Sequence, residues 1–408
     1  MPSHRSLTLL TLLSVVLCCW DLLQAQSPPG GLVVIGIGDA GEDNSTLRAT
    51  GFYVSDMYTG RHDAGKPDVL LFLGDNFIPL GLNGPGVDAD GTARSLFRKF
   101  DDVFATMPQQ QVHAIPGEHD YYSRFGQVQS TFFGLFTSGE FPTGISNRGV
   151  IREHLRREWT FHSGMASEMV WPVRPGGGDS AQFIFFDSAL LLRTDPSQWH
   201  PALESLRRIL IGSRDRQGIT WRILCAHHPW YSLGEHGGYS VWNDDDSTVE
   251  YLPNCDRDSN SAGYVRNWLD PEDLCADRYI RYVDSIRSAI RSGSVKVHLI
   301  LSAHDRSLQL LYEPERDREC DLCPEIQIVS GAASRTTRVR QPSPPYEFTS
   351  ASGHPEDEGI SLPGFVQLLF GPDRIRVIFY NSRNGDRIDM GAGRRVFWVD
   401  RSGKLLPE

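Results

Sequence analysis

Residues Val69–Phe77 read V-L-L-F-L-G-D-N-F, and this stretch decides the fold. An apolar run of this length that stops at a turn signal is typical of a strand buried on both faces of a sheet. A carboxylate at the carboxyl end of such a strand lies at the sheet edge where α/β proteins bind their ligands. Asp75 is therefore a candidate for the centre of a site. The alternative is an ordinary Asp-Asn turn that only ends the strand.

Other apolar runs predict further strands of the same kind. Gly31–Asp39 predicts a first strand, and the helical spacing of Thr46–Tyr58 predicts the helix that leads to Val69–Asp75. Such a unit has parallel strands, so Asp39 and Asp75 are expected at the same sheet edge. Additional strands are predicted at Gln111–Pro116, Ala181–Asp187, Trp221–Ala226, Val295–Leu301, Ile326–Ser330, Phe365–Phe370 and Arg374–Tyr380, and additional helices at Leu96–Phe104, Trp199–Ser213 and Tyr279–Arg291.

Composition and the N-terminal sequence predict an exported globular protein. The 408 residues are 40% hydrophobic and 22% charged, and the net charge of −11 argues against a nucleic-acid partner. The apolar run Leu7–Trp20, followed by Ala25, predicts a signal peptide over residues 1–25. A signal anchor is the alternative, but the run is short for a membrane span. We expect a secreted or secretory-lumen protein with no transmembrane segment after signal removal.

The cysteines and one sequon fit that compartment. Five cysteines follow the signal peptide, and export favours a disulfide between Cys255 and Cys275. Cys320 and Cys323 form a C-x-x-C for which a local disulfide is favoured over a metal, because a second such pair is absent from the sequence. Cys225 is predicted to be a buried thiol. Asn44 begins a glycosylation sequon, which is a weak signal.

The residues that follow five predicted strands share a chemistry. Each of the five strand ends carries Asp, Glu or His: Gly38-Asp39, Gly74-Asp75-Asn76, Gly117-Glu118-His119-Asp120, His227-His228 and His304-Asp305. One such residue alone is more often an ordinary turn residue than a ligand. Five groups that converge on one edge are what a divalent transition-metal site needs. A two-metal phosphate site would also need a carboxylate shared by both ions.

In this order, the motifs Asp-x-Gly, Gly-Asp-Asn-Phe, Gly-x-His-Asp and His-x-Pro, followed by His304-Asp305, resemble the calcineurin-like metallophosphoesterases. The resemblance is strongest to the small purple, or tartrate-resistant, acid phosphatases, and it covers most of residues 31–380. It implies a four-layer αββα sandwich of two mixed β-sheets flanked by helices. We expect one such domain over residues 31–400, with a polar insertion at residues 235–276.

The resemblance also implies roles for individual residues. Asp39 would bind the first metal, and Asp75 would bridge both metals. The second metal would take Asp75 together with Glu118, His227 and His304. The two remaining histidines of the motifs, His119 and His236, would contact phosphate and protonate the leaving group.

Three positions depart from the family pattern. Ile78 replaces a tyrosine ligand, Arg306 replaces a histidine ligand, and Glu118 stands where the family has asparagine. The first metal thus keeps only Asp39 and Asp75, which is too few for a tight site. We hypothesise that the Arg306 guanidinium lies where that metal would be and pairs with both carboxylates. One ion of iron, zinc or manganese is then expected rather than two, and Arg306 is expected to help bind phosphate.

Three functions remain open at this point. The first is a secreted acid-phosphatase-like enzyme that hydrolyses the phosphate monoesters of a small molecule or phosphoprotein through a metal-bound water, with activity weakened by the degenerate site. The second is a non-catalytic relative that serves as an exported binding or anchoring protein with a protein partner. The third is a phosphodiesterase or nucleotidase with a different metal pair.

Overall fold

The computed structural model describes residues 31–62, 65–77, 111–121, 160–237, 240–243, 248–251, 274, 276–312, 320–339, 345–351 and 359–407. The signal peptide, Ile78, the helix predicted at Leu96–Phe104 and the pair Cys255 and Cys275 lie outside these ranges, so those predictions stay predictions. Within the same ranges, no helix combines the length and apolar character needed to cross a membrane.

The first sheet is built around the parallel strands that the sequence predicts. β1 (Leu32–Ile37), β2 (Val69–Leu73) and β3 (Val112–Ile115) lie side by side and run parallel. Antiparallel strands extend the sheet beyond β1, so it is mixed. The order is β18-β17-β16-β1-β2-β3-β4, with β4 at Thr160–Phe161, β16 at Gly364–Phe370, β17 at Arg374–Asn381 and β18 at Phe397–Asp400.

The second sheet is also mixed and has the order β14-β11-β12-β10-β7-β6-β5. Its centre is parallel, because β6, β7, β10 and β12 all run the same way, and β5, β11 and β14 are antiparallel to their neighbours. The bounds are β5 Ser167–Pro172, β6 Ser180–Phe186, β7 Ile219–Ala226, β10 Leu299–Ser302, β11 Leu308–Tyr312, β12 Ile326–Ser330 and β14 Glu347–Thr349.

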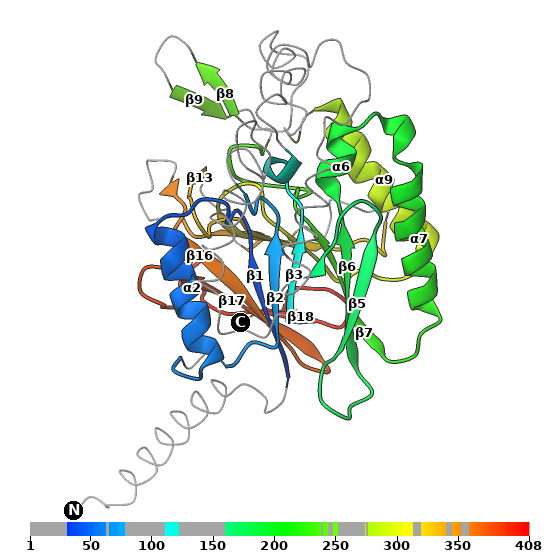
Figure 1. The fold of residues 1–408 in the computed structure, drawn as a ribbon, viewed down its shortest axis with the longest axis horizontal. Helices are drawn as coiled ribbons and strands as arrows, with labels where there is room; N and C mark the ends of the chain where they lie inside the picture. Colours follow the sequence, from blue (N-terminus) through cyan, green and yellow to red (C-terminus); the bar gives the residue numbers. More distant parts are fainter. Residues whose placement is uncertain are drawn as a thin grey trace, which may run out of the picture.

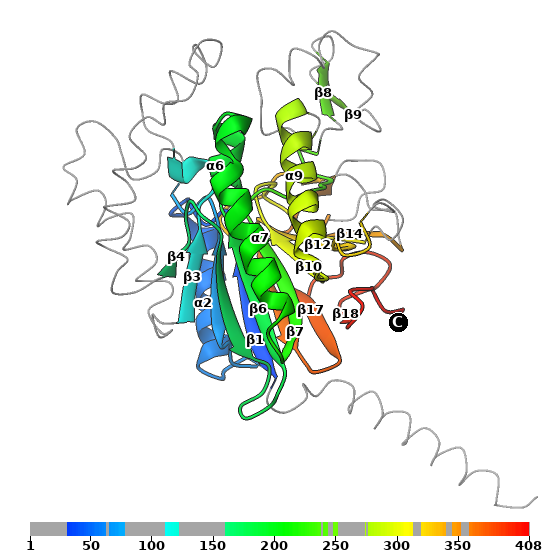
Figure 2. The ribbon, with the colours of Figure 1, turned by 90° about the vertical axis from the view of Figure 1, so that its right-hand side faces the viewer.

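Helices cover the outer faces of the two sheets. α2 (Ser45–Tyr58) packs on the first sheet, whereas α6 (Ser188–Arg193), α7 (His200–Arg214) and α9 (Asp277–Gly293) cover the second. Figures 1 and 2 show α2 on one side of the molecule and the other three helices on the opposite side. The predicted four-layer αββα sandwich is therefore confirmed.

Side chains that point alternately to the two faces of each strand fill the cores between these layers. In β2, Val69, Leu71 and Leu73 face the core between the two sheets. Leu70 and Phe72 point the other way, into the core under α2. Because successive side chains of a strand point to opposite faces, a continuous apolar run serves two cores at once. Each fully buried side chain of this size contributes roughly 1.5–3 kcal/mol.

Several short elements were missed by the sequence analysis. No strand was predicted between Ile326–Ser330 and Phe365–Phe370, but β14 lies there and pairs with β11 through Phe348 and its neighbours. Turn-forming residues around β14 hide a strand of only three residues. Among its described residues, the polar insertion contains the antiparallel pair β8 (Ser240–Asn243) and β9 (Thr248–Tyr251). The other small elements are β13 Arg338–Val339 with β15 Gly359–Ile360, η2 His119–Tyr121 and η3 Pro196–Gln198.

Two cysteine predictions are confirmed. Cys320 and Cys323 form a disulfide with an S–S distance of 2.04 Å. Cys225 in β7 is a buried free thiol, and burial raises its pKa well above the usual range. It packs in the core between the two sheets, which is the inert role expected for a buried cysteine.

Candidate metal centre

Five strand ends from the two sheets place the predicted ligands at one edge of the molecule. Asp39, Asp75 and Glu118 follow β1, β2 and β3, and Figure 1 shows those three strands pointing to that edge with η2 directly beyond β3. His227 and His304 follow β7 and β10 of the second sheet. All five side chains are buried. The site therefore sits where the carboxyl ends of both sheets meet.

Several residues at this edge have a positive φ angle, which residues other than glycine rarely adopt. Asp39, Asp75, His304 and Arg306 have φ angles of 53°, 52°, 70° and 31°. A non-glycine residue in the left-handed region costs of order 1 kcal/mol or more and persists only where the surroundings impose it. Four such residues at one edge show that the loops turn sharply to aim their side chains inward.

Two glycines allow the loops to approach each other closely. A Cβ added to Gly74 would lie 2.3 Å from His227 Nδ1, and one added to Gly117 would lie 2.3 Å from Asp75 Oδ1. Gly74 also has a φ angle of 98°. Any side chain at these positions would push the predicted ligands apart.

Glu118 is the centre of the predicted second metal site. Its Oε2 lies 2.8 Å from His227 Nε2 and 3.3 Å from His304 Nδ1, and Asp75 Oδ1 lies 3.6 Å from His227 Nε2. Glu118 Oε2, His227 Nε2 and His304 Nδ1 are buried without a hydrogen bond of acceptable geometry to any described residue. Buried polar atoms are almost always paired, so atoms of this chemistry and spacing fit a bound divalent cation.

Arg306 lies on the opposite side of the site, next to Asp39. Its Nε is 3.9 Å from Asp39 Oδ1, and both oxygens of Asp39 are buried without a hydrogen bond within the described residues. The hypothesis that Arg306 also pairs with Asp75 needs correction, since the described residues show no such ion pair. Asp75 Oδ1 instead accepts a hydrogen bond of 2.9 Å from His119 N, which turns that oxygen toward β3. Burial would lower the pKa of Arg306, but Asp39 and then Asp75 overcome this effect and raise it.

The electrostatics show that this pocket favours positive charge. Burial, and then the neighbouring Asp75, raise the pKa of Asp39 well above its usual range. Burial would lower the pKa of His227, but Glu118 and Asp75 reverse this and raise it well above the usual value. Likewise, His304 and His227 overcome burial and lower the pKa of Glu118. The acidic neighbours therefore favour the charged form of the His227 imidazole.

The two histidines predicted to contact phosphate border the ligand cluster. His119 is partly exposed, and its Nε2 lies 3.4 Å from Arg306 Nη2 and 3.7 Å from Asp75 Oδ2. The His236 ring packs 4.3 Å from the His304 ring, between centroids. His236 N donates a 2.9 Å hydrogen bond to Asp305 Oδ1. All eight predicted site residues thus lie in one cluster.

Asp120 and Asp305 position the loops, and the sequence analysis assigned neither a role. Asp120 accepts 2.9 Å hydrogen bonds from Gly117 N and Phe77 N. Burial, and then Asp75, raise the pKa of Asp120 to about 7. The sequence did carry a signal for Asp120, because this carboxylate follows a predicted strand and lies two residues after the predicted ligand Glu118. The carboxylate of Asp305 packs against Gly234, in the segment that follows β7. A Cβ added to Gly234 would lie 2.7 Å from Asp305 Cγ.

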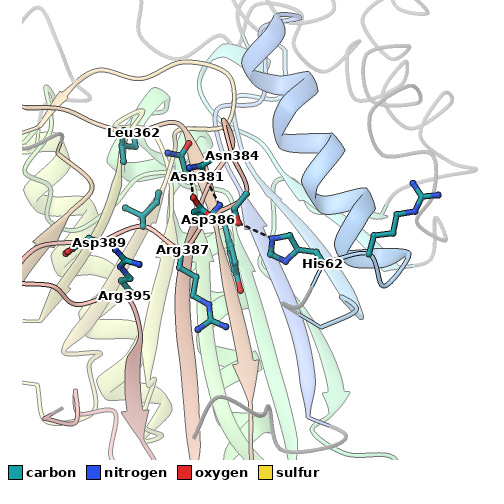
Figure 3. A pocket seen from close by; sticks show the side chains of 12 residues that line it. His62, Leu362, Asn381, Asn384, Asp386, Arg387, Asp389 and Arg395 are labelled. Carbon is teal, nitrogen blue, oxygen red and sulfur yellow. Dashed lines mark hydrogen bonds between the residues drawn. The ribbon is translucent and has the colours of Figure 1, made fainter. Parts of the chain in front are cut away.

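A separate hollow of about 760 Å³ lies beside the turn that follows β17. Figure 3 shows its polar lining, in which His62 Nε2 lies 3.0 Å from Gly385 O. Arg387 and Arg395 line it together with Asp386, so charges of both signs are mixed there. It shares no residue with the strand-end cluster, and we assign it no role.

A sequence model of the calcineurin-like phosphoesterase family matches residues 33–259, more than half of the chain. The chain belongs to the calcineurin-like phosphoesterase family. The match includes the loops that carry Asp39, Asp75, Glu118 and His227, whereas His304 lies beyond it. The predicted family is therefore confirmed. No curated protein sequence matches the chain.

Solved structures share the phosphoesterase fold with this chain at low sequence identity. The structure of GAP50, described as the anchor in the inner membrane complex of Plasmodium, matches with a TM-score of 0.50 and 14% identity, covering 88% of this chain and 89% of that one. The structure of PhoD matches with a TM-score of 0.52 and 9% identity, covering 92% and 71%. The purple acid phosphatase PPD1 from yellow lupin has a TM-score of 0.48 and 14% identity, covering 93% and 55%.

Proposed function

We propose that this phosphoesterase-family protein is a secreted, metal-dependent phosphomonoesterase that works with one divalent ion. The observation that carries the proposal is the buried cluster of Glu118, His227 and His304, whose facing atoms have no hydrogen bond among the described residues. A cation at this position satisfies all three atoms at once. The partly exposed His119 and the cationic Arg306 lie next to the cluster and face the same space.

Each residue contributes a distinct part of the chemistry. When bound, the ion supplies Lewis-acid polarisation of a phosphate and a nucleophilic water. Arg306 offers only donors, in a fork that matches phosphate oxygens, so it holds and orients the substrate. His119 and His236, which border the cluster, would contact the phosphate and give a proton to the leaving oxygen.

Charge neutrality supports one ion rather than two. Asp39, Asp75 and Glu118 are buried carboxylates, and Arg306 is the permanent cation that the structure places beside them. When the three carboxylates are ionised, two negative charges remain after pairing with Arg306, and one divalent ion neutralises them. A second divalent ion would have to share its place with a guanidinium, and uncompensated buried charge is strongly unfavourable.

The donor set suggests which metals are suitable. Two imidazoles and two carboxylates suit zinc, iron or manganese better than magnesium or calcium, which prefer oxygen ligands alone. The predicted signal peptide supports a location outside the cell or in the secretory lumen. The substrate would be the phosphate monoester of a small molecule or of a phosphoprotein.

Hydrolysis of p-nitrophenyl phosphate tests this function. The full mature chain would be assayed at acidic and neutral pH after addition of zinc, manganese or iron, with bis-p-nitrophenyl phosphate as the diester comparison. We expect monoester hydrolysis that disappears in His227→Ala and His304→Ala. Activity that survives both substitutions, or a preference for the diester, would contradict the proposal.

One observation favours a second candidate, a non-catalytic anchoring protein. Arg306 sits beside Asp39, where the family would bind its first metal, and this arrangement weakens a two-metal mechanism. The fold is also similar to that of GAP50, which is described as an anchor. Under this alternative the ion would be structural, and no monoester hydrolysis would be detected with any of the three metals.

A further inference from the structure

We propose that His228 is an additional ligand of the bound ion, which joins Glu118, His227 and His304 in one buried group of three imidazoles and one carboxylate beside Asp75. The inference rests on the proposed metal-dependent function, but it assigns a ligand that the family resemblance does not imply. His228 is the residue between the predicted ligand His227 and Pro229, and its side chain is fully buried.

Distances around the Glu118 carboxylate support the assignment. His228 Nε2 lies 3.6 Å from Glu118 Oε2, close to the 2.8 Å and 3.3 Å of the two predicted histidine ligands. One atom from each of the four residues lies within 4.8 Å of every other. In a tetrahedral zinc site with bonds of about 2.0–2.1 Å, neighbouring ligand atoms are about 3.3–3.4 Å apart. The measured spacings bracket that value.

His228 Nε2 lacks any other satisfactory partner. The atom is buried and makes no hydrogen bond to a described residue, as is true of Glu118 Oε2, His227 Nε2 and His304 Nδ1. A buried nitrogen without a hydrogen bond is unfavourable. The ion pair between His227 and Glu118, 2.8 Å apart, offsets part of this cost, but it leaves His228 Nε2 and His304 Nδ1 without a hydrogen bond to a described residue. A single cation satisfies them together.

The opposite sides of the His227 and His228 rings are held as a metal-binding histidine requires. His228 Nδ1 lies 2.9 Å from Ser188 Oγ, and that hydroxyl also accepts a 3.1 Å hydrogen bond from His228 N. His227 Nδ1 lies 2.7 Å from Leu73 O. Such contacts fix the ring orientation and leave Nε2 for the metal, which is the usual arrangement around histidine ligands. Ser188, the first residue of α6, is therefore a positioning residue.

Zinc affinity measured by competition with a chromophoric chelator tests the assignment. The metal-free mature protein would be titrated beside His228→Phe, Ser188→Ala and His298→Phe, the last being a control at a buried histidine outside the cluster. We expect His228→Phe to weaken zinc binding at least about tenfold, Ser188→Ala to weaken it by a smaller factor, and the control to stay within about twofold. The visible spectrum of the cobalt(II)-loaded protein should also change in His228→Phe, because one imidazole leaves the coordination sphere.

The possible failures are distinguishable. Unchanged zinc affinity and an unchanged cobalt spectrum in His228→Phe, with metal binding intact, would overturn this assignment alone. Wild-type protein that bound none of zinc, manganese and iron would overturn both the assignment and the proposed function. Ser188→Ala keeps the test decisive if His228→Phe does not fold, since it leaves the three imidazoles and the Glu118 carboxylate in the chain.

Discussion

Arg306 Nε lies 3.9 Å from Asp39 Oδ1, which belongs to the carboxylate that we predicted as a ligand of a first metal. A guanidinium there supplies positive charge without any ligand atoms, since arginine offers only donors. Asp39 is fully buried, so an uncompensated carboxylate would be costly at this position. Under the proposed function, Arg306 would supply the positive charge of a first metal ion but none of its ligand chemistry.

Replacing Arg306 with histidine should open the first metal site. Arg306→His removes the cation and supplies the imidazole that the family pattern has at this position. We expect the number of zinc ions bound per chain to rise from one toward two, measured by elemental analysis after removal of free metal. Arg306→Gln is the control, because it removes the charge without adding a strong ligand. An increase in Arg306→Gln equal to that in Arg306→His would show that the imidazole is not the cause.

Gly117→Ala should damage the site and the fold together. The new Cβ would lie 2.3 Å from Asp75 Oδ1 and 2.4 Å from Asp75 N. We expect a loss of roughly 1–3 kcal/mol in the free energy of unfolding, because overpacking a buried site costs this much. Urea unfolding would measure it. In the matched control Gly212→Ala, the Cβ meets nothing within 4 Å in α7, so a stabilisation of up to about 1 kcal/mol is expected from helix propensity. Equal effects of the two substitutions would contradict the account.

Asp120→Ala should loosen the loops that carry Asp75 and Glu118. The substitution leaves Gly117 N and Phe77 N without the carboxylate that accepts their hydrogen bonds. Each unsatisfied buried donor costs roughly 1–3 kcal/mol. We expect a clear fall in the thermal midpoint and weaker zinc binding. Asp120→Asn keeps one acceptor oxygen and should fall between Asp120→Ala and the wild type. A wild-type midpoint in Asp120→Ala would show that these bonds do not position the loops.

Acid should destabilise the fold through histidines outside the site. Burial lowers the pKa of His113 to about 4, and burial together with His113 lowers that of His162 to about 3. Both pKa values lie below that of an unfolded histidine, near 6.5, so the unfolded chain binds more protons below that pH. Their contribution to stability is complete above pH 6.5 and is lost as the pH falls toward 4.

The size of this acid effect can be measured by urea unfolding at pH 7 and pH 5. Each histidine should contribute roughly 1–2 kcal/mol to the loss between those two pH values. Replacing both with phenylalanine should reduce the loss, because neither side chain then titrates. The two rings stack beside Phe185, so aromatic shape is preserved. An identical loss in the double variant would assign the acid sensitivity to other groups.

The amount of structure predictable from the sequence differs between the sheets and the site. Long apolar runs such as Val69–Phe72 fix where the buried strands lie, because the same run fills two cores. Short strands such as β14 were not predicted, because the hydrophobic pattern of three residues does not distinguish a strand from a loop. Asp75 was identified from its position after a strand, but its hydrogen bond with His119 N depends on the sharp left-handed turn that only coordinates show.

His228 illustrates the same limit at the level of chemistry. In the sequence it is one of two adjacent histidines, and adjacent side chains usually point in different directions. The structure brings both rings to Glu118, because Ser188 and Leu73 hold the other nitrogen of each ring. The sequence does not show either contact, because Ser188 and Leu73 are far from the two histidines along the chain and reach them only through the packing of different elements.

The number of metal ions bound per chain tests the central claim most directly. Mature protein would be saturated with zinc, freed of loosely bound metal by gel filtration, and analysed for zinc and protein. The account predicts one ion per chain, lost in His227→Ala and His304→Ala. Two tightly bound ions per chain in the wild type would contradict it, because Arg306 could not then occupy the space beside Asp39.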